Sequence, residues 1–293
     1  MSSPHLHRQA IVLMLVAVAL FAVMDAGLKH LAADYPVFQV AALRGLSSLP
    51  IVMVWVLLTV DPRSLLKVHW PLHLLRGVLG IGMMVGFVFG LRSLPLTTAY
   101  AIAFVAPLLV AVMAGPLLKE RIGRGRWIAV SIGLAGMLVI LRPTGEGVLT
   151  AAGLAVLFSA ACYAAGSITV RMLAQRDSTQ AMVFWFLLLL SLGAGALALP
   201  HWVPMRGADI GVIAVVGLAG SLAQIALTEA FRRGEASLIA PLDYTALVWV
   251  VILDVALWGV LPDAMTWLGA AIIVVSGLYL LRREKVHVEA EHP

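Results

Sequence analysis

Six acidic or basic side chains lie within long apolar runs of this sequence, where a charged group could do chemistry. They are four acids and two bases: Asp25, Glu229, Asp243, Asp254, Arg44 and Arg76. An ionised side chain at the centre of a membrane costs roughly 2.5–3.5 kcal/mol on insertion scales, so each of these groups needs a partner or a function. Glu229 lies near Arg232 and Arg233 at the end of its run, and we expect it to reach the membrane surface. Asp254 is also close to the end of its run, so it could either reach the membrane surface or have a function within the membrane.

Asp25 and Arg44 are predicted to form a buried ion pair. Asp25 lies near the end of the first apolar run and Arg44 near the start of the second. At 1.5 Å per helical residue, both lie about 10 Å below the same membrane surface. Neighbouring helices joined by a short loop can bring them together, which would order a gate at that surface. Lys29, one helical turn from Asp25, is the expected competitor for the carboxylate.

Two prolines interrupt apolar runs at corresponding places in the two halves of the chain. Pro107 lies in the middle of one run and Pro241 near the start of another. Each proline frees a backbone carbonyl group, which is tolerated where it faces protein or a wet cavity. Paired breaks of this kind are typical of the binding site of a secondary transporter. Asp243 follows the second break, where it could exchange a proton, hold a substrate ammonium, or simply cap the restarted helix.

Aromatic side chains could bind the apolar part of a substrate in such a cavity. Six are candidates: Tyr100, Tyr163, Phe184, Trp185, Tyr244 and Trp249. Aromatic residues of membrane proteins more often anchor the protein at the lipid interface. We therefore expect only Tyr100, Tyr244 and Trp249, which neighbour the proline breaks, to line the cavity.

The elements that must position these residues are membrane-spanning helices. Of 293 residues, 62% are hydrophobic and 12% are charged, and the mean hydropathy is +1.01. A soluble domain is about half apolar and a quarter charged, so lipid must cover much of this chain. A spanning helix needs about 20 mostly apolar residues. Ten segments fit: Gln9–Leu31, Val37–Leu58, Leu72–Leu91, Leu96–Leu118, Trp127–Leu141, Leu149–Met172, Ala181–Leu199, Ile210–Phe231, Ala236–Trp258 and Met265–Leu281.

One of these segments carries a regular glycine pattern. Gly82, Gly86 and Gly90 follow one another at four-residue intervals, which leaves a bare groove along one helix face. Close packing of a neighbouring helix is the expected use of this groove. A gating helix that slides would use the same groove.

The loops between the segments predict how the chain is oriented. Of the 20 lysines and arginines, 14 lie on one side of the membrane, and only Lys29, Arg92, Arg142 and Arg206 lie on the other. Basic residues concentrate in cytoplasmic loops, so we expect a multi-pass protein of the cell inner membrane with both termini in the cytoplasm. The net charge of +5 comes from these short loop clusters, and nucleic-acid binding is not expected.

A weak internal repeat divides the chain in two. The spacing from Trp127 to the Leu-Arg pair ending at Arg142 equals that from Trp267 to the pair ending at Arg282. Each repeat has five helices and so crosses the membrane an odd number of times. The second copy therefore enters the membrane from the opposite side. We predict an all-α fold of ten transmembrane helices arranged as two inverted five-helix repeats, residues 1–142 and 143–293.

Several short motifs follow one another in a fixed order. They are Asp25 and Lys29, Arg44, Arg76-Gly77, Leu94–Ala99, Pro107, Glu120, Trp127–Pro143, Ala236–Pro241, Asp243-Tyr244, Pro262-Asp263 and Gly269–Gly277. In this order the chain resembles the EamA-type branch of the drug/metabolite transporter superfamily, from the first helix to Arg283. The resemblance implies transport of small molecules and leaves the substrate open. The family's usual Glu before the Pro-Asp pair is absent here, because the chain reads Gly259-Val260-Leu261 at that point, and no role for it is carried over.

The sequence therefore predicts a secondary transporter, an exporter of amino acids, related zwitterions or amino-acid-derived metallophores. The alternative is uptake of a nutrient such as riboflavin or S-adenosylmethionine, for which the same family has members. An intramembrane enzyme is a distant alternative, because the sequence has no His-Glu-x-x-His, Gly-x-Ser-x-Gly or phosphate-binding loop. We expect no catalytic residue, metal or cofactor. The expected partners are a small-molecule substrate and the lipid bilayer, with a homodimer left open.

Overall fold

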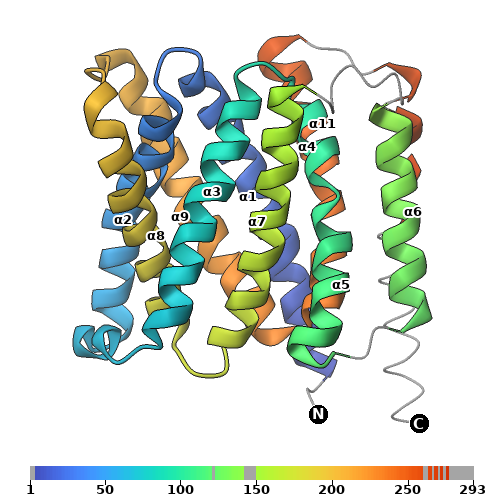
Figure 1. The fold of residues 1–293 in the computed structure, drawn as a ribbon, viewed down its shortest axis with the longest axis horizontal. Coiled ribbons are helices and arrows are strands. Elements are labelled where there is room, and N and C mark those ends of the chain that lie inside the picture. Colours follow the sequence, from blue (N-terminus) through green and yellow to red (C-terminus); the bar gives the residue numbers. More distant parts are fainter. Residues whose placement is uncertain are drawn as a thin grey trace.

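The structure, a computed structural model, is a bundle of helices (Figure 1). It describes residues 4–120, 123–141 and 150–259, with 263–265, 267–269, 271–272 and 275–276. The α-helices in chain order are α1 (Pro4–Ala32), α2 (Val37–Thr59), α3 (Trp70–Leu91), α4 (Leu96–Ala103), α5 (Ala106–Leu118), α6 (Arg124–Leu141), α7 (Ala151–Leu173), α8 (Thr179–Ala198), α9 (Ile210–Arg233), α10 (Ala236–Ile239) and α11 (Ala246–Trp258). The short 3₁₀ helices are η1 (Pro62–Leu66), η2 (Leu199–His201), η3 (Gly207–Asp209) and η4 (Ala240–Thr245).

Eight helical segments within the described ranges are long and apolar enough to cross a bilayer. They correspond to eight of the ten predicted segments, so the chain is an all-helical, multi-pass membrane protein. The predicted fifth segment is α6, whose apolar stretch, Trp127–Gly136, is shorter than a span. The predicted tenth segment, Met265–Leu281, falls largely outside the described residues. Ten helices and their inverted arrangement therefore stay predictions.

Both proline breaks are present in the backbone. The predicted fourth segment divides at Phe104 and Val105 into α4 and α5, and Pro107 lies in the first turn of α5. The predicted ninth segment consists of α10, η4 and α11, with Pro241 in the first turn of η4. A proline is tolerated in a first turn because the N–H that it lacks would have no partner within the helix there.

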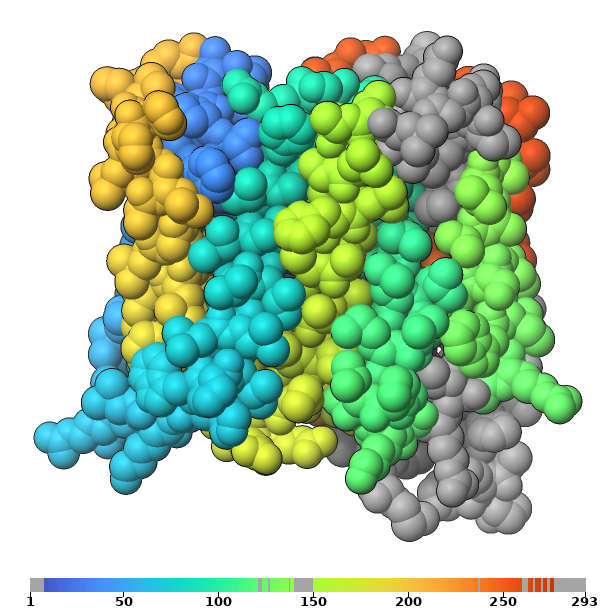
Figure 2. Space-filling model, viewed as in Figure 1, coloured from blue at the N-terminus to red at the C-terminus, as the bar shows by residue number. Residues whose placement is uncertain are grey.

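The most extensive contacts join helices from the two halves of the sequence. α1 packs on α9, α2 on α8, and α3 on α7. Figure 1 shows α2 beside α8 and α3 beside α7, and Figure 2 shows their side chains closely packed on this face. The glycine groove is part of the last contact, since a Cβ atom at Gly86 would lie 2.6 Å from the Ala155 carbonyl oxygen of α7. The groove thus serves close helix packing, the use expected from the sequence.

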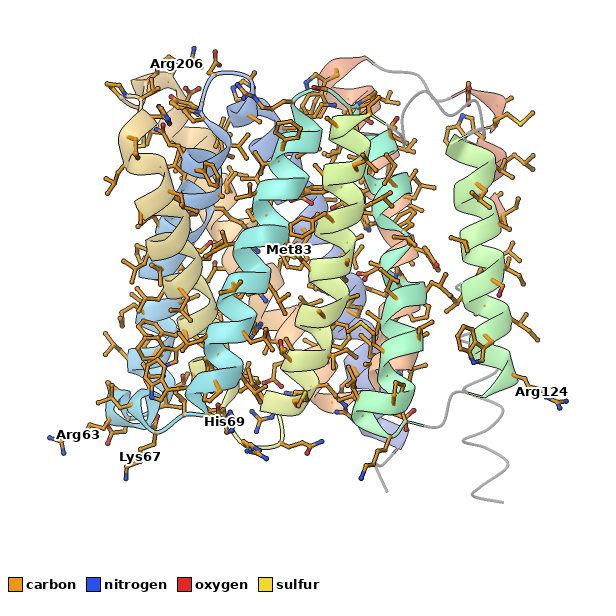
Figure 3. All side chains as sticks on the ribbon, viewed as in Figure 1. Arg63, Lys67, His69, Met83, Arg124 and Arg206 are labelled. Carbon is orange, nitrogen blue, oxygen red and sulfur yellow. The ribbon has the colours of Figure 1, made fainter. Side chains whose placement is uncertain are left out.

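Charged side chains mark the two ends of the bundle. Figure 3 labels Arg63, Lys67 and Arg124 at one end and Arg206 at the opposite end. These ends are called the Arg63 end and the Arg206 end below. Many large apolar side chains are exposed between them, for example Leu58 on α2. Exposed apolar surface on this scale suits contact with lipid.

Candidate functional site

A cavity of about 170 Å³ lies inside the bundle, lined mainly by apolar side chains. Its described walls come from most of the helices, and they include Met83, which Figure 3 labels halfway along α3. Two acids and two bases line it: Asp25, Asp243, Arg44 and Arg76. Four charged groups in one apolar space inside the bundle make this cavity the candidate site.

Asp25 of α1 is held by a tyrosine of α4. The Tyr100 hydroxyl donates a 2.6 Å hydrogen bond to Asp25 Oδ2. The ring of Tyr100 packs edge-on against Phe87 and Phe104, with centroids 5.7 and 6.1 Å away. α4 ends at the break before Pro107, and both Tyr100 and Pro107 line the cavity.

Asp243 has an equivalent partner. The Tyr163 hydroxyl of α7 donates a 2.8 Å hydrogen bond to Asp243 Oδ2. Asp243 lies in η4, two residues after Pro241, so this carboxylate faces the cavity from an interrupted helix. Each carboxylate in the cavity thus accepts a hydrogen bond from one tyrosine hydroxyl.

The two arginines are held by neutral groups. Arg44 Nη2 donates to Gln224 Oε1 at 3.2 Å, and Arg76 Nη1 donates to the Met182 carbonyl oxygen at 2.9 Å. Both guanidinium carbons lie over the ring of Phe186, at 5.6 Å for Arg44 and 4.8 Å for Arg76. Cation–π contacts and neutral acceptors stabilise a guanidinium without cancelling its charge.

The predicted ion pair between Asp25 and Arg44 is not formed as a direct contact. Both side chains line the cavity, yet none of the ion pairs between described residues joins them. α9 packs against both α1 and α2, and its Gln224 takes the guanidinium while Tyr100 takes the carboxylate. No feature of the sequence indicated that α9 lies there.

Lys29 pairs with a different acid from the one expected. Its Nζ lies 3.3 Å from Asp254 Oδ1 and 4.2 Å from the centre of the Trp258 ring. Asp254 also accepts hydrogen bonds from Thr97, through the backbone N–H at 2.9 Å and through the hydroxyl. These contacts join α1, α4 and α11 outside the cavity, so Asp254 has a structural role that explains its burial.

Glu229 lies on α9 toward the Arg63 end. It accepts hydrogen bonds from Arg233 Nε at 2.8 Å and from the Thr179 hydroxyl. Its side chain is partly exposed, and it does not line the cavity. That Glu229 reaches the membrane surface stays a prediction.

Arg206, in the connection before α9, holds the opposite end of the bundle together. It forms ion pairs with Asp209 Oδ2, at 2.9 Å, and with Asp34. Tyr35 donates a 2.6 Å hydrogen bond to the same Asp209 oxygen. The hydrogen bonds to Asp209 and Asp34 hold the pKa of Arg206 above its usual range.

The sequence matches the EamA-like transporter family over residues 8–142 and 150–282. The chain belongs to the EamA-like transporter family. The match covers both halves, and each half supplies one aspartate–tyrosine pair: Asp25 with Tyr100, and Asp243 with Tyr163.

Relatives of this EamA-like chain are named as transporters of different molecules. It is 32% identical to a riboflavin transporter of Rhizobium johnstonii, over 75% of this chain and 73% of that one. It is 28% identical to the pseudopaline exporter CntI of Pseudomonas aeruginosa, over 95% and 98% of the two chains. It is 27% identical to an S-adenosylmethionine uptake transporter of Rickettsia prowazekii, over 78% of each. The chain is thus a small-molecule transporter of the drug/metabolite type.

A solved structure supports the fold. A crystal structure matches with a TM-score of 0.79 at 20% sequence identity. The alignment covers 94% of this chain and 97% of the other. At this identity the likeness concerns the fold alone.

Not all residues expected in the site of this EamA-like transporter lie there. Tyr100 and Pro107 line the cavity. Tyr244 is buried against α6, where a Cβ atom at Gly133 would come within 2.2 Å of its ring. Trp249 is 44% exposed. Neither Tyr244, Trp249 nor Pro241 is among the described lining residues, so proximity to a break was a poor guide to cavity lining.

Sequence reasoning missed the neutral residues that hold the arginines. Phe186 and Gln224 line the cavity, and Thr228 completes the contacts of Arg76. A glutamine and a threonine four residues apart in an apolar run are a usable signal, because they fall on one helix face. In the described residues no group of three or more His, Cys, Asp or Glu side chains is placed to hold a metal ion.

Proposed function

We propose that this EamA-like transporter is a secondary transporter that exports small organic zwitterions. Amino acids, related amphiphilic zwitterions and amino-acid-derived metallophores are the proposed substrates. The charge distribution of the cavity carries the proposal. The formal charges of the four acidic and basic residues that line it sum to zero. A net-neutral molecule with separate ammonium and carboxylate groups complements such a surface.

The aspartate–tyrosine pairs are the proposed sites for an ammonium group or a proton. Asp243 lies beside a helix break, where a change in backbone conformation is easiest to accommodate. We propose that Asp243 binds a proton in one conformation of the transporter and releases it in the other, which would couple export to a pH gradient. Asp25, with Tyr100 and Pro107, would bind the substrate from the opposite half.

The ends of the bundle support an orientation. Arg63, Lys67 and Arg124 lie at one end, and Arg206 lies at the other (Figure 3). Basic residues favour the cytoplasmic side, so we propose an inner-membrane protein with the Arg63 end and both termini in the cytoplasm. Residues 1–142 and 143–293 are proposed as two inverted five-helix repeats. Export would then run from the Arg63 end to the Arg206 end.

Uptake of a nutrient is the second candidate function, supported by the names of the riboflavin and S-adenosylmethionine relatives. S-adenosylmethionine carries an ammonium and a carboxylate that could meet the acids and bases of the cavity, but its sulfonium adds a positive charge, so it complements the net-neutral cavity less fully than an amino acid does. Riboflavin carries no carboxylate and offers no charged partner to Arg44 or Arg76. The cavity therefore favours a zwitterion in either direction of transport.

Flux measurements on reconstituted protein test the proposal. Liposomes containing the purified protein are loaded with amino acids and a small-metabolite extract of the source cells, and a pH gradient of either sign is applied. We expect zwitterions to leave chemically unchanged, at a rate that depends on the gradient. Riboflavin moving while every zwitterion stays inside would overturn the proposed substrate class. A chemically altered product would instead indicate an enzyme.

A further inference from the structure

Arg44 and Arg76 are the most deeply buried basic groups of the cavity. Arg44 is 1% exposed and Arg76 is 3% exposed. Neither takes part in an ion pair with any described acid. Burying a charge without an opposite charge is costly, and buried charges in proteins are normally paired. The two acids that line the same cavity, Asp25 and Asp243, form an ion pair with neither group, so both guanidinium groups lack a direct anionic contact among the described residues.

One donor atom of Arg44 is left without a partner. Its Nη1 is buried and makes no hydrogen bond with the described residues, while Nε reaches only the sulfur of Met24, at 3.3 Å. A thioether sulfur is a weak acceptor. Arg44 thus keeps hydrogen-bonding capacity that the described protein does not use, on a side chain that lines the cavity.

α9 sets the two guanidinium groups at successive heights. Arg44 donates to Gln224, and Arg76 Nη2 donates to the Thr228 hydroxyl at 3.4 Å. Gln224 and Thr228 are four residues apart on α9, which is about 6 Å along the helix axis. Both guanidinium carbons lie over the Phe186 ring, at 5.6 Å for Arg44 and 4.8 Å for Arg76, so both groups are close to the same side chain.

The Phe186 ring has room only because a glycine faces it. A Cβ atom at Gly80 of α3 would lie 2.4 Å from Phe186 Cε2, so any larger residue would displace the ring. The ring packs against both guanidinium groups. The arrangement therefore holds two cations in place while leaving the in-plane donor of Arg44 unoccupied.

We propose that Arg44 and Arg76, which both contact Phe186, form an anion subsite that binds a carboxylate of the transported molecule. A guanidinium group presents parallel N–H donors that match the two oxygens of a carboxylate. The subsite rests on the proposed function, and it gives the substrate a defined orientation in the cavity. The carboxylate of the substrate lies toward the arginines, and its ammonium lies toward Asp25 and Asp243.

A binding measurement tests the subsite directly. Thermal unfolding of the purified protein in a neutral detergent is followed at constant ionic strength with three sets of probes. These are the standard amino acids, the α-carboxamide of each, and unbranched monocarboxylates and dicarboxylates. We expect one or more acids to stabilise the wild-type protein, with roughly tenfold to hundredfold higher apparent affinity than the matching amides. Equal effects of acids and amides throughout the panel would overturn the proposal.

Substitutions then assign the effect to the two arginines. Arg44→Gln and Arg76→Gln should lose the preference for acids over amides, and Gly80→Ala should weaken it by displacing the ring. Arg92→Gln is the matched control, because Arg92 contacts the Ala32 carbonyl oxygen outside the cavity. Arg44→Lys keeps the charge without the fork of donors and should retain part of the preference. A preference that survives in both glutamine variants would contradict the subsite.

Failure of the subsite and failure of the proposed function give different results. Binding is read without flux, so a protein that prefers acids but moves none across liposomes keeps the anion subsite and loses the proposed transport. A protein that exports an amide as fast as the matching acid keeps the transport and loses the subsite.

Discussion

Asp25 and Asp243 come from opposite halves of the chain and line one cavity, and each accepts a hydrogen bond from a tyrosine of its own half. The two carboxylates are thus equivalent in their hydrogen bonding but differ in their backbone. Asp25 lies within the continuous helix α1, whereas Asp243 lies in η4 between two helices. This difference suggests a division of roles, with Asp25 as a fixed contact and Asp243 as the group that responds to conformational change.

Removing the Tyr100 hydroxyl separates its stabilising role from its transport role. Tyr100→Phe leaves the Asp25 carboxylate without its donor, which should cost about 1–3 kcal/mol of stability. We expect thermal unfolding at a lower temperature and a large loss of substrate flux. Tyr35→Phe is the matched control, because Tyr35 donates an equally short bond to Asp209, outside the cavity. If both variants lose flux to the same extent, the cavity location of Tyr100 has no special importance.

Asp243→Asn tests the coupling carboxylate. The amide keeps the size of the side chain and can still accept from Tyr163, so expression and folding should be preserved. An amide cannot carry the proton, so we expect flux driven by a pH gradient to be abolished, while exchange of labelled against unlabelled substrate continues. Both activities are measured in liposomes. Glu229→Gln serves as the control, since Glu229 lies outside the cavity. A variant with unchanged pH dependence and unchanged substrate affinity would leave Asp243 as a helix cap.

Arg44→Met distinguishes an unpaired arginine from an ion-paired one. Breaking a buried ion pair costs about 3–5 kcal/mol, whereas removing a buried charge that has no ionic partner also removes the cost of burying that charge. Because Arg44 has no acid in direct contact, we expect the unfolding temperature of Arg44→Met to equal or exceed that of the wild type, while transport is lost. A large fall in unfolding temperature would show that the field of Asp25 compensates Arg44 even without contact.

Helix positions followed closely from the sequence, because hydrophobic length is a local property. α2 was predicted at Val37–Leu58 and lies at Val37–Thr59, and α9 was predicted at Ile210–Phe231 and lies at Ile210–Arg233. The breaks near Pro107 and Pro241 followed equally from local chemistry. The fifth segment was harder to assign as a membrane span, because its apolar stretch is shorter than a span.

The partners of the buried charges could not be derived in the same way. Which acid meets which base depends on how helices pack, and the sequence does not state that α9 lies between α1 and α2. Distance in the chain suggested Asp25 with Arg44 and with Lys29, but Lys29 pairs with Asp254, 225 residues away. Gln224 and Thr228 were not predicted either, because they are neutral and only ionisable residues had been considered as partners. Their side chains hold the arginines.

Asp254→Asn should destabilise the protein more than Glu229→Gln does. The Asp254 side chain is 1% exposed, and it accepts hydrogen bonds from Lys29 and from the backbone N–H of Thr97 in the first turn of α4, which has no partner within that helix. Its amide would leave the Lys29 ammonium without a counter-charge in a buried contact, at a cost of several kcal/mol. Glu229 pairs with Arg233 one helical turn away, near the surface, where such pairs contribute about 0.3–0.5 kcal/mol. Unfolding temperatures of the two variants measure the difference. Equal temperatures would contradict a structural role for the Asp254 contacts.

Gly86→Ala tests whether α3 and α7 must approach each other closely. The new Cβ atom would lie 2.6 Å from the Ala155 carbonyl oxygen, a backbone atom that cannot turn away. The two helices would have to separate, and overpacking of this kind costs about 1–3 kcal/mol. The better helix propensity of alanine returns at most about 1 kcal/mol.

Gly211→Ala is the matched control, since nothing lies within 4 Å of its Cβ position on α9, and it should be neutral or slightly stabilising. Because the separation would also shift Ser159 and Tyr163 at the cavity wall, we expect Gly86→Ala to lower flux together with the unfolding temperature. An unfolding temperature for Gly86→Ala at or above that of Gly211→Ala would show that the helices yield freely, and the groove would then be a sliding surface rather than a fixed contact.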